Sequence, residues 1–339
     1  MPILCIRKVL GCAVAVLGVL CSIGALAQDA DPKEWTLALP NHSGQLAWSA
    51  PGFKITENSA KAGGKEIGFR GLDASTHVGY LSFLFLFPEQ APLTSAKCRD
   101  GVIGPEKKAN PTYKELSSSE SPGQNGISVV TVGYSVLGQD HKLHYSLRSF
   151  AASGDICGDF ELYSSEPIRP EEPRVRAILG SYRLDPNYSP KFRDVFQYAQ
   201  VLFNSERYKD AAPIFEQALG MIPADGAPFP SAKVAQRVTT DQAGMSYGIS
   251  SQYAKARAIF EAGVAADPDY PMYYYNLACA DAGEDKLPAA QAHLEQAFAR
   301  KTNVNPGESM PDPTKDDSFL PYKSNKAFWA ALEKMKSGN

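Results

Sequence analysis

The sequence predicts an α+β domain, with an antiparallel sheet and packed helices, followed by an all-α solenoid of helix pairs with a capping helix. Three observations lead to this prediction. Short segments rich in β-branched and aromatic residues, separated by Gly, Pro, Asn and Ser clusters, fill the N-terminal half. A helical pattern recurs at a fixed spacing in the C-terminal half. The length of 339 residues suffices for two ordinary domains, and 44% hydrophobic with 21% charged residues is typical of globular proteins.

Residues 1–27 have the features of a secretory signal peptide. A basic stretch ends at Lys8, an apolar run begins at Val9, and an Ala-Leu-Ala triplet ends at Ala27. We expect cleavage after Ala27, and therefore an exported protein, periplasmic or extracellular, without a stable transmembrane span once the signal is removed. Residues 9–27 also approach the roughly 18–20 residues that a membrane span needs, so an uncleaved anchor is the alternative.

Residues 30–185 are expected to form the α+β domain. A helix is predicted over 171–184, with Val175, Ile178, Leu179 and Tyr182 on the stripe that faces the sheet. A short helix is predicted over 94–103. The order of these elements is loosely similar to that of the PsbP-like sandwich. The predicted strands cover residues 34–40, 44–50, 65–72, 77–87, 126–137, 141–152 and 155–165.

Three cysteines remain after removal of the signal: Cys98, Cys157 and Cys279. In an oxidising compartment we expect a disulfide between Cys98 and Cys157, which both belong to the α+β domain. It would close a loop of about sixty residues, worth about 4 kcal/mol in the chain-entropy model. The alternative is that all three thiols are free and buried.

The repeat is visible in two segments, residues 206–223 and 251–268, which share six of eighteen positions. In a third copy, Leu287, Ala290 and Leu294 follow Tyr253, Ala256 and Phe260 by thirty-four residues. A small residue, Ala199, Gly244 or Ala278, lies in the preceding helix of each copy. We expect this small residue to let the two helices of a pair approach closely, while the bulky Phe or Leu fills the space between pairs.

This thirty-four-residue pattern is similar to that of the tetratricopeptide repeat (TPR) family, over residues 191–301. The resemblance implies three units of paired helices, A and B, at about 192–225, 237–270 and 271–304. About eleven extra residues, near 224–234, separate the first two units. A connector (305–323) and a capping helix (324–336), with Phe328, Trp329 and Leu332 inward, complete the solenoid.

In this family, ligands lie along the concave face that the A helices line. The family's carboxylate clamp of Lys, Asn and Arg is absent, because Phe196, Asp241 and Tyr275 occupy comparable places. The remaining groove is apolar and aromatic and suits a hydrophobic or helical segment. The alternative is that the N-terminal domain or the connector covers it. The resemblance places these residues in the groove: Arg193, Phe196, Gln200, Phe203, Asn204, Asp241, Met245, Ile249, Met272, Tyr275 and Cys279.

No catalytic, metal or cofactor site is predicted. Gly244–Gly248 matches the G-x-S-x-G nucleophile elbow, but the repeat pattern places Ser246 inside a helix. His141 and His144 are predicted at a turn and on a strand, where they do not share a face. Asp159 and Glu161 do share a strand face with Cys157, as a polar patch. No phosphate-binding or dinucleotide-binding fingerprint is present.

These expectations combine into a non-enzymatic, exported TPR adaptor that binds a protein or peptide segment in the cell envelope or outside the cell. A formal net charge of -3 argues against a nucleic-acid partner. The alternative function is a ligand-binding or enzymatic N-terminal domain, near Cys157, that is docked through the TPR array.

Overall fold

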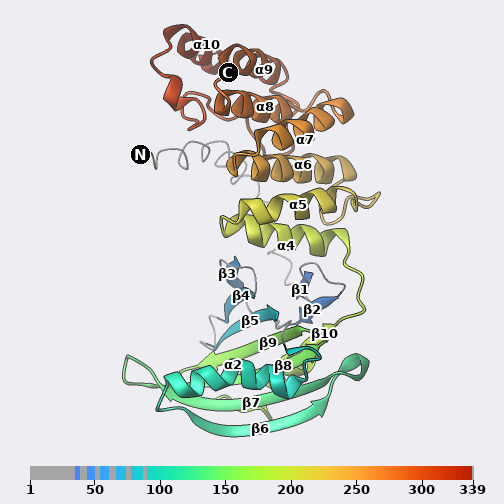
Figure 1. Ribbon diagram of the computed structural model, residues 1–339, viewed down its shortest axis with the longest axis vertical. Helices are drawn as coiled ribbons and strands as arrows, with labels where there is room; N and C mark the ends of the chain where they lie inside the picture. Colours follow the sequence, from blue (N-terminus) through green and yellow to red (C-terminus); the bar gives the residue numbers. More distant parts are fainter. Residues whose placement is uncertain are drawn as a thin grey trace. The chain divides into compact units, whose positions relative to one another are not determined.

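The computed structural model describes residues 35–38, 44–49, 54–60, 66–73, 78–86 and 90–337. The predicted signal peptide lies outside these residues. The chain divides into two compact units, Ala30–Ser205 and Glu206–Asn339 (Figure 1). Among the helices of the described ranges, none has the length and apolar character needed to cross a membrane.

The first unit contains two antiparallel sheets. In the larger sheet, two runs of sequential strands meet where β5 pairs with β9. The smaller sheet has the order β1 (Trp35–Ala38), β2 (Gln45–Trp48) and β10 (Arg183–Asp185). The larger sheet has the order β3 (Lys54–Ala60), β4 (Glu66–Asp73), β5 (Val78–Leu86), β9 (Ile156–Ser164), β8 (Leu143–Ser153), β7 (Ser128–Leu137) and β6 (Lys114–Pro122).

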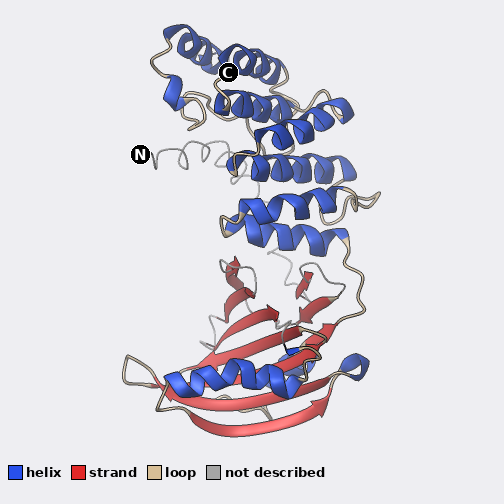
Figure 2. Ribbon diagram, in the orientation of Figure 1, coloured by secondary structure: helices blue, strands red, loops and turns tan. Residues whose placement is uncertain are grey.

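Alternating side chains of β8 and β9 build two cores, one on each face of the large sheet. On one face, α2 (Ser95–Ala109) covers Phe150 and Cys157, as Figure 2 shows for the helix and the strands. On the other face, the ring of Phe160 stacks on that of Tyr182 at 5.7 Å. Gly158 also lies on this face, and a Cβ added there would collide with the Tyr182 hydroxyl. The α+β prediction is confirmed in this layered form; the resemblance to the PsbP-like sandwich stays a prediction.

The predicted disulfide between Cys98 and Cys157 is present, with the two Cα atoms 5.4 Å apart. Both cysteines are fully buried. The bond joins α2 to β9 and so attaches the helix covalently to the central part of the large sheet.

A buried ionic cluster attaches the same helix to the same sheet. Arg148 on β8 forms a bidentate ion pair with Asp159 on β9, and its Nη1 lies 2.9 Å from Oε2 of Glu106 on α2. Tyr134 donates to Oε1 of Glu106 at 2.9 Å. Burial raises the pKa of Asp159 to about 6, and the charge of Arg148 opposes that rise. The polar patch predicted near Cys157 is therefore internally paired.

Several elements differ from their predictions. Strand β6 was missed because its sequence, KELSSSESP, lacks apolar alternation; it is an exposed edge strand, where no face is buried. Strand β3 was missed as well. The predicted helix 171–184 is shorter, since α3 (Pro173–Ser181) ends before the chain joins the small sheet as β10. Helix α2 continues to Ala109 instead of ending at residue 103.

The second unit is a TPR-like series of antiparallel helix pairs. The helices follow the predicted repeat closely, since Tyr208, Tyr253 and Leu287 each begin a helix B. Helices α6 and α8, the A helices of neighbouring pairs, contact each other. The helices are α5 (Tyr208–Leu219), α6 (Ala232–Ile249), α7 (Tyr253–Ala266), α8 (Pro271–Gly283), α9 (Leu287–Ala299) and α10 (Lys326–Ser337).

A recurring turn marks each pair independently of the apolar pattern. Glu206, Ser251 and Asp285 have φ values of 59°, 60° and 59°, in the left-handed region. Each lies two residues before the start of a helix B. The same left-handed φ value thus recurs before each helix B, with a different side chain each time.

The small-against-bulky packing predicted for the repeat is confirmed in both complete pairs. Gly244 on α6 lies against the ring of Phe260 on α7, so closely that an added Cβ would collide with the ring. In the next pair, Ala278, Ala290 and Leu294 are all fully buried in one cluster.

The first predicted pair differs, because α4 (Phe192–Asn204) belongs to the sheet unit and α5 to the helical unit. Helix α4 packs on β1 and β3. Its buried Asp194 accepts hydrogen bonds from Thr36 Oγ1 and Tyr188 Oη, both at 2.8 Å. These bonds join the first turn of α4 to the small sheet, and the three-unit array stays a prediction.

We expect Phe260→Ala to lower the free energy of unfolding by about 3–5 kcal/mol, because it empties the space between two helix pairs. Phe260 is 2% exposed. Urea unfolding of the full chain, followed by circular dichroism, measures the change. Glu261→Ala, at an exposed position of the same helix, is the control. A loss below about 1 kcal/mol for Phe260→Ala would contradict this packing.

We expect Arg148→Met to cost about 3–5 kcal/mol near neutral pH, because it leaves buried carboxylates without their cation. The cost should be smaller at mildly acidic pH. Without Arg148 the folded-state pKa of Asp159 rises further, so stability is lost as pH increases through it. Denaturation at two pH values tests this, with exposed Arg176→Met as the control. A cost that does not change with pH would contradict it.

Candidate binding face

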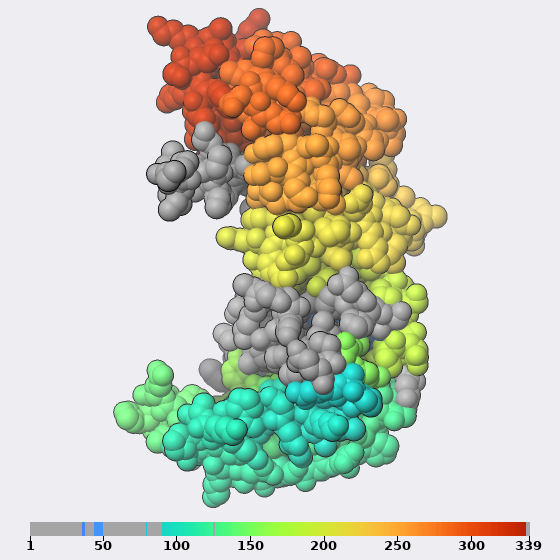
Figure 3. Space-filling model, viewed as in Figure 1, coloured from blue at the N-terminus to red at the C-terminus, as the bar shows by residue number. Residues whose placement is uncertain are grey.

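The segment that follows α9 folds back across the A helices α6 and α8. We call residues 303–319 the strap. Figure 3 shows the red C-terminal part of the chain lying directly against the orange helices. The strap leads into a short 3-10 turn (Leu320–Tyr322) and then into α10. Two sets of contacts hold it, one near each end.

The first anchor joins Asn305 and Glu308 to Tyr270, the residue that precedes α8. The Tyr270 hydroxyl lies 2.9 Å from Oε1 of Glu308, and Nδ2 of Asn305 donates to it at 3.2 Å. The same hydroxyl lies 2.8 Å from Oδ2 of Asp241 on α6. Oδ1 of Asp241 accepts from Asn276 Nδ2 on α8 at 3.1 Å. The strap is thus joined to both A helices through one tyrosine.

Arg237 on α6 adds a cation to this anchor. Its Nη1 donates to the backbone oxygen of Asn303 at 3.0 Å, and its guanidinium lies 4.3 Å from the ring centre of Tyr270. Its Nε donates to Oδ2 of Asp267 at 2.7 Å. Helix α6 begins twelve residues before its small residue Gly244, whereas α8 begins seven residues before Ala278. Helix α6 is therefore longer than α8 at its N-terminal end, and this extension coincides with the insertion predicted between the first two units.

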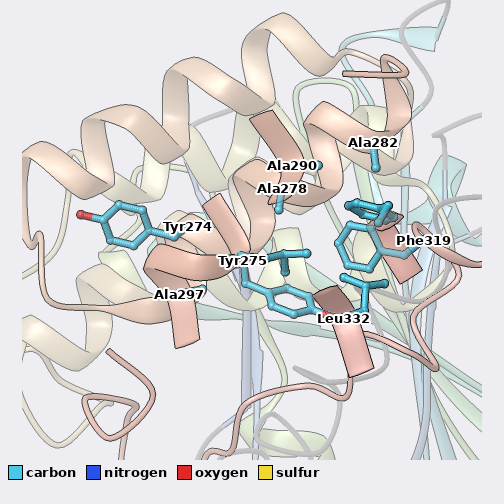
Figure 4. Close-up of a cluster of buried hydrophobic side chains, with 10 residues drawn as sticks. Tyr274, Tyr275, Ala278, Ala282, Ala290, Ala297, Phe319 and Leu332 are labelled. Atoms are coloured by element: carbon cyan, nitrogen blue, oxygen red, sulfur yellow. The ribbon is translucent and has the colours of Figure 1, made fainter. Parts of the chain in front are cut away.

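The second anchor joins Asp316 and Phe319 to Tyr275 on α8. Tyr275 donates to Oδ2 of Asp316 at 2.9 Å, and its ring meets that of Phe319 edge to face at 6.0 Å. Figure 4 shows Tyr275, Phe319 and Leu332 in one cluster. Leu332 and the buried Phe328 come from α10, so this anchor is continuous with the core under the last helix.

Burial governs the electrostatics of both anchors. It raises the pKa of Asp241 well above its usual value, and the nearby Glu308 raises it further. Burial likewise raises the pKa values of Glu308 and Asp316. Three carboxyl groups are therefore held where the protonated form is favoured relative to water.

The predicted groove residues of α6 and α8 fall into two groups. Asp241, Met245, Met272 and Tyr275 are buried; Tyr275 contacts the strap directly, and Asp241 is linked to it through the Tyr270 hydroxyl. Ile249 and Cys279 are half-buried and line a cavity of about 20 Å³ between α6, α7 and α8, with room for about one water molecule. The connector alternative left open by the sequence thus applies to Asp241 and Tyr275. The role of these residues as ligand contacts stays a prediction.

The predicted groove residues of α4 lie in the other unit. Arg193 donates to Thr36 Oγ1 on β1 at 3.1 Å, and Gln200 donates to Asn204 at 3.0 Å. Phe196 and Phe203 are buried. Within the helical unit, the face described here is built by α6 and α8.

The motifs examined for chemistry have structural roles. Ser246 is buried inside α6, and its hydroxyl donates to the backbone oxygen of Gln242 at 2.7 Å. It therefore has the helical setting predicted for it and not that of a nucleophile elbow. His141 lies in a turn, and His144, on β8, contacts Asp140 at 2.9 Å. The predicted placement of both histidines is confirmed.

The residues that sequence reasoning missed are those of the first anchor: Arg237, Tyr270, Asn305 and Glu308. Asn305 lies sixty-eight positions from Arg237 in the chain. The strap has no apolar periodicity from which its buried side could be read. The sequence feature that pointed to this anchor was the segment Tyr270–Tyr275, in which four tyrosines carry hydroxyl groups that need hydrogen-bond partners when buried.

No protein-family model matches the sequence, and the comparison with curated proteins gives no match. Among solved structures, the chain is similar to the Sgt2 TPR domain from Aspergillus fumigatus, with 17% identity over 44% of this chain and 80% of that one and a TM-score of 0.30. It is also similar to MamA from Desulfovibrio magneticus RS-1, with 19% identity over 43% and 75% and a TM-score of 0.31. A third is the type III secretion translocator chaperone SycD from Yersinia enterocolitica, with 17% identity over 43% and 92% and a TM-score of 0.28. Since these TM-scores are low, the TPR-like assignment rests on the helix pairs described above.

Proposed function

We propose that the chain is an exported, non-enzymatic adaptor that holds a segment of another protein on the face of α6 and α8. The observation that carries this proposal is the strap itself. A non-helical segment with several turns lies on this face, and donors on or next to the helices engage its carboxylates and one of its backbone oxygens. A face that can hold one non-helical segment in this way has the chemistry to hold another.

The contacts of the strap define the partner that would suit this face. Tyr270, Tyr275 and Arg237 supply hydrogen-bond donors, and a hydrophobic cluster receives the ring of Phe319. The partner segment would therefore be non-helical and would carry carboxylates a few residues from an aromatic side chain. This refines the sequence prediction of a hydrophobic or helical segment.

The alternative is a ligand-binding or enzymatic sheet unit. Its motivation was the polar patch near Cys157, but Arg148 and its carboxylates satisfy one another there. A polar hollow does exist at the start of α2. Ser95, which lines it, already donates to the Ser128 backbone oxygen at 2.6 Å and accepts from the Ala152 N–H at 3.1 Å. The adaptor is therefore better supported than a ligand-binding or enzymatic sheet unit.

Site-specific photocrosslinking in the producing cell tests the adaptor. A photoreactive residue in place of Ile249, a half-buried residue of the predicted groove, should give discrete protein adducts. The same residue in place of exposed Glu261, on helix B, is the matched control. Adding Phe319→Ala to the Ile249 variant should increase the adducts, because it weakens the second anchor. Identical adduct patterns from both positions would contradict the proposed face.

Export is tested separately, by mass spectrometry of the N-terminus of the protein recovered from the producing cell. We expect the chain to begin at Gln28, after cleavage at the Ala-Leu-Ala triplet. A chain that retains residues 1–27 would contradict cleavage and favour the anchor alternative.

A further inference from the structure

In the first anchor, two carboxyl groups lie within hydrogen-bond distance of the Tyr270 hydroxyl, which has a single hydrogen to donate. Tyr270 has one hydroxyl hydrogen, yet its oxygen lies 2.8 Å from Oδ2 of Asp241 and 2.9 Å from Oε1 of Glu308. Asn305 Nδ2 donates to the same oxygen. With both carboxyl groups ionised, only one could accept the tyrosine hydrogen, and the other would place a charged oxygen against an oxygen lone pair. A proton kept on one carboxyl group supplies the missing hydrogen.

We propose that Asp241 and Glu308 share one proton through Tyr270, and that loss of this proton releases residues 303–308 of the strap from α6 and α8. The strap is thus a proton-locked cover of the binding face. The inference rests on the proposed function for its biological meaning, because it describes how access to that face is regulated.

The charged groups around the pair balance one carboxylate but not two. Arg237 lies over the Tyr270 ring, and Lys233 Nζ lies 3.4 Å from Oδ1 of Asp267. These two cations balance Asp267 and one ionised carboxyl of the pair. Tyr273 packs edge to face on Tyr270 at 4.8 Å, and burial raises the pKa of its phenol, so it stays neutral. Among the described residues, a second carboxylate charge in the pair would have no further cation in contact with it.

The direction of the pH effect follows from the pKa shifts. Burial raises the pKa values of Asp241 and Glu308 in the closed state. In the open state a released Glu308 would return toward the ordinary value of about 4. The closed state therefore holds one more proton than the open state between these two values. Closure is complete at low pH and is lost as pH rises through the closed-state pKa of the pair.

The second anchor should remain closed when the first one opens. Asp316 receives hydrogens from the Tyr275 hydroxyl and from the backbone N–H of Ser318 at 2.9 Å each, so its contacts require no extra proton. Phe319 beside it is fully buried in the cluster that continues into α10. Burial also raises the pKa of Asp316, but the hydrophobic cluster around Phe319 holds this end of the strap whether or not Asp316 is ionised, so it serves as the reference for the other end.

Hydrogen–deuterium exchange of the full mature chain, without any partner, tests the proposal. The reporters are the amide of Glu308, which donates to the Asn305 oxygen at 3.0 Å, and that of Asn305, which donates to Oε2 of Glu308 at 2.8 Å. After correction for intrinsic exchange, protection of residues 303–311 should fall about tenfold per pH unit between the open-state and closed-state pKa values and then level off, as expected for one released proton. Protection of the Phe319 and Tyr322 amides should stay constant.

Glu308→Gln is the decisive variant, because its amide can donate to the Tyr270 oxygen at every pH. Protection of residues 303–311 should then no longer depend on pH. Glu333→Gln, at an exposed position of α10, should behave as the wild type. A pH-independent wild type, or a Glu308→Gln variant that opens as the wild type does, would overturn the proposal.

An infrared measurement detects the proton without reference to strap opening. The wild type at neutral pH should show the carbonyl band of a buried, protonated carboxylic acid. Glu308→Gln and Asp241→Asn should each abolish it, because the remaining carboxylate then ionises. A band from another buried carboxyl group, such as Asp316, would persist in all three spectra, so the shared proton is overturned if neither substitution removes a carbonyl band from the wild-type spectrum. Since no partner is present in either experiment, these results are independent of the photocrosslinking outcome.

Discussion

The helical unit depends on one kind of contact, in which a small residue in one helix receives a bulky side chain from the next. Gly244 lies against Phe260, and Ala278 and Ala290 share a cluster with Leu294. Close approach of the helices in each pair places α6 and α8 side by side, which creates the shared face. A larger residue at Gly244 would displace the ring, and the positions of Asp241 and Asn276 relative to each other would change with it.

The strap occupies the face that this packing creates, and it does so mainly through polar contacts. Buried carboxyl groups, tyrosines and an arginine are costly to remove from water unless each finds a partner. In the first anchor almost every polar atom has a hydrogen-bonding partner, provided that Asp241 and Glu308 retain one proton between them. The polar character that makes the strap specific for its position therefore also makes it sensitive to pH. An apolar strap would hold the face at any pH and could not respond.

Sequence reasoning succeeded where structure depends on local spacing. The helix B starts at Tyr208, Tyr253 and Leu287, and the disulfide between Cys98 and Cys157, were all predictable from pattern and compartment. It failed where a segment takes its conformation from distant partners. The serine-rich strand β6 is held by pairing with β7 and by no apolar face. The burial of Asn305 depends on Arg237, and the attachment of α4 depends on Thr36, neither of which local periodicity can indicate.

The covalent attachment of the strap has a quantitative consequence for any competitor. A segment tethered through a few residues to the helix beside its own site experiences an effective concentration of the order of millimolar. A free peptide that made identical contacts, at micromolar concentration, would be at a disadvantage of about a thousandfold. The tethered strap therefore has an entropic advantage over a free competitor for this face. A partner chain must make contacts beyond those of the strap in order to displace it.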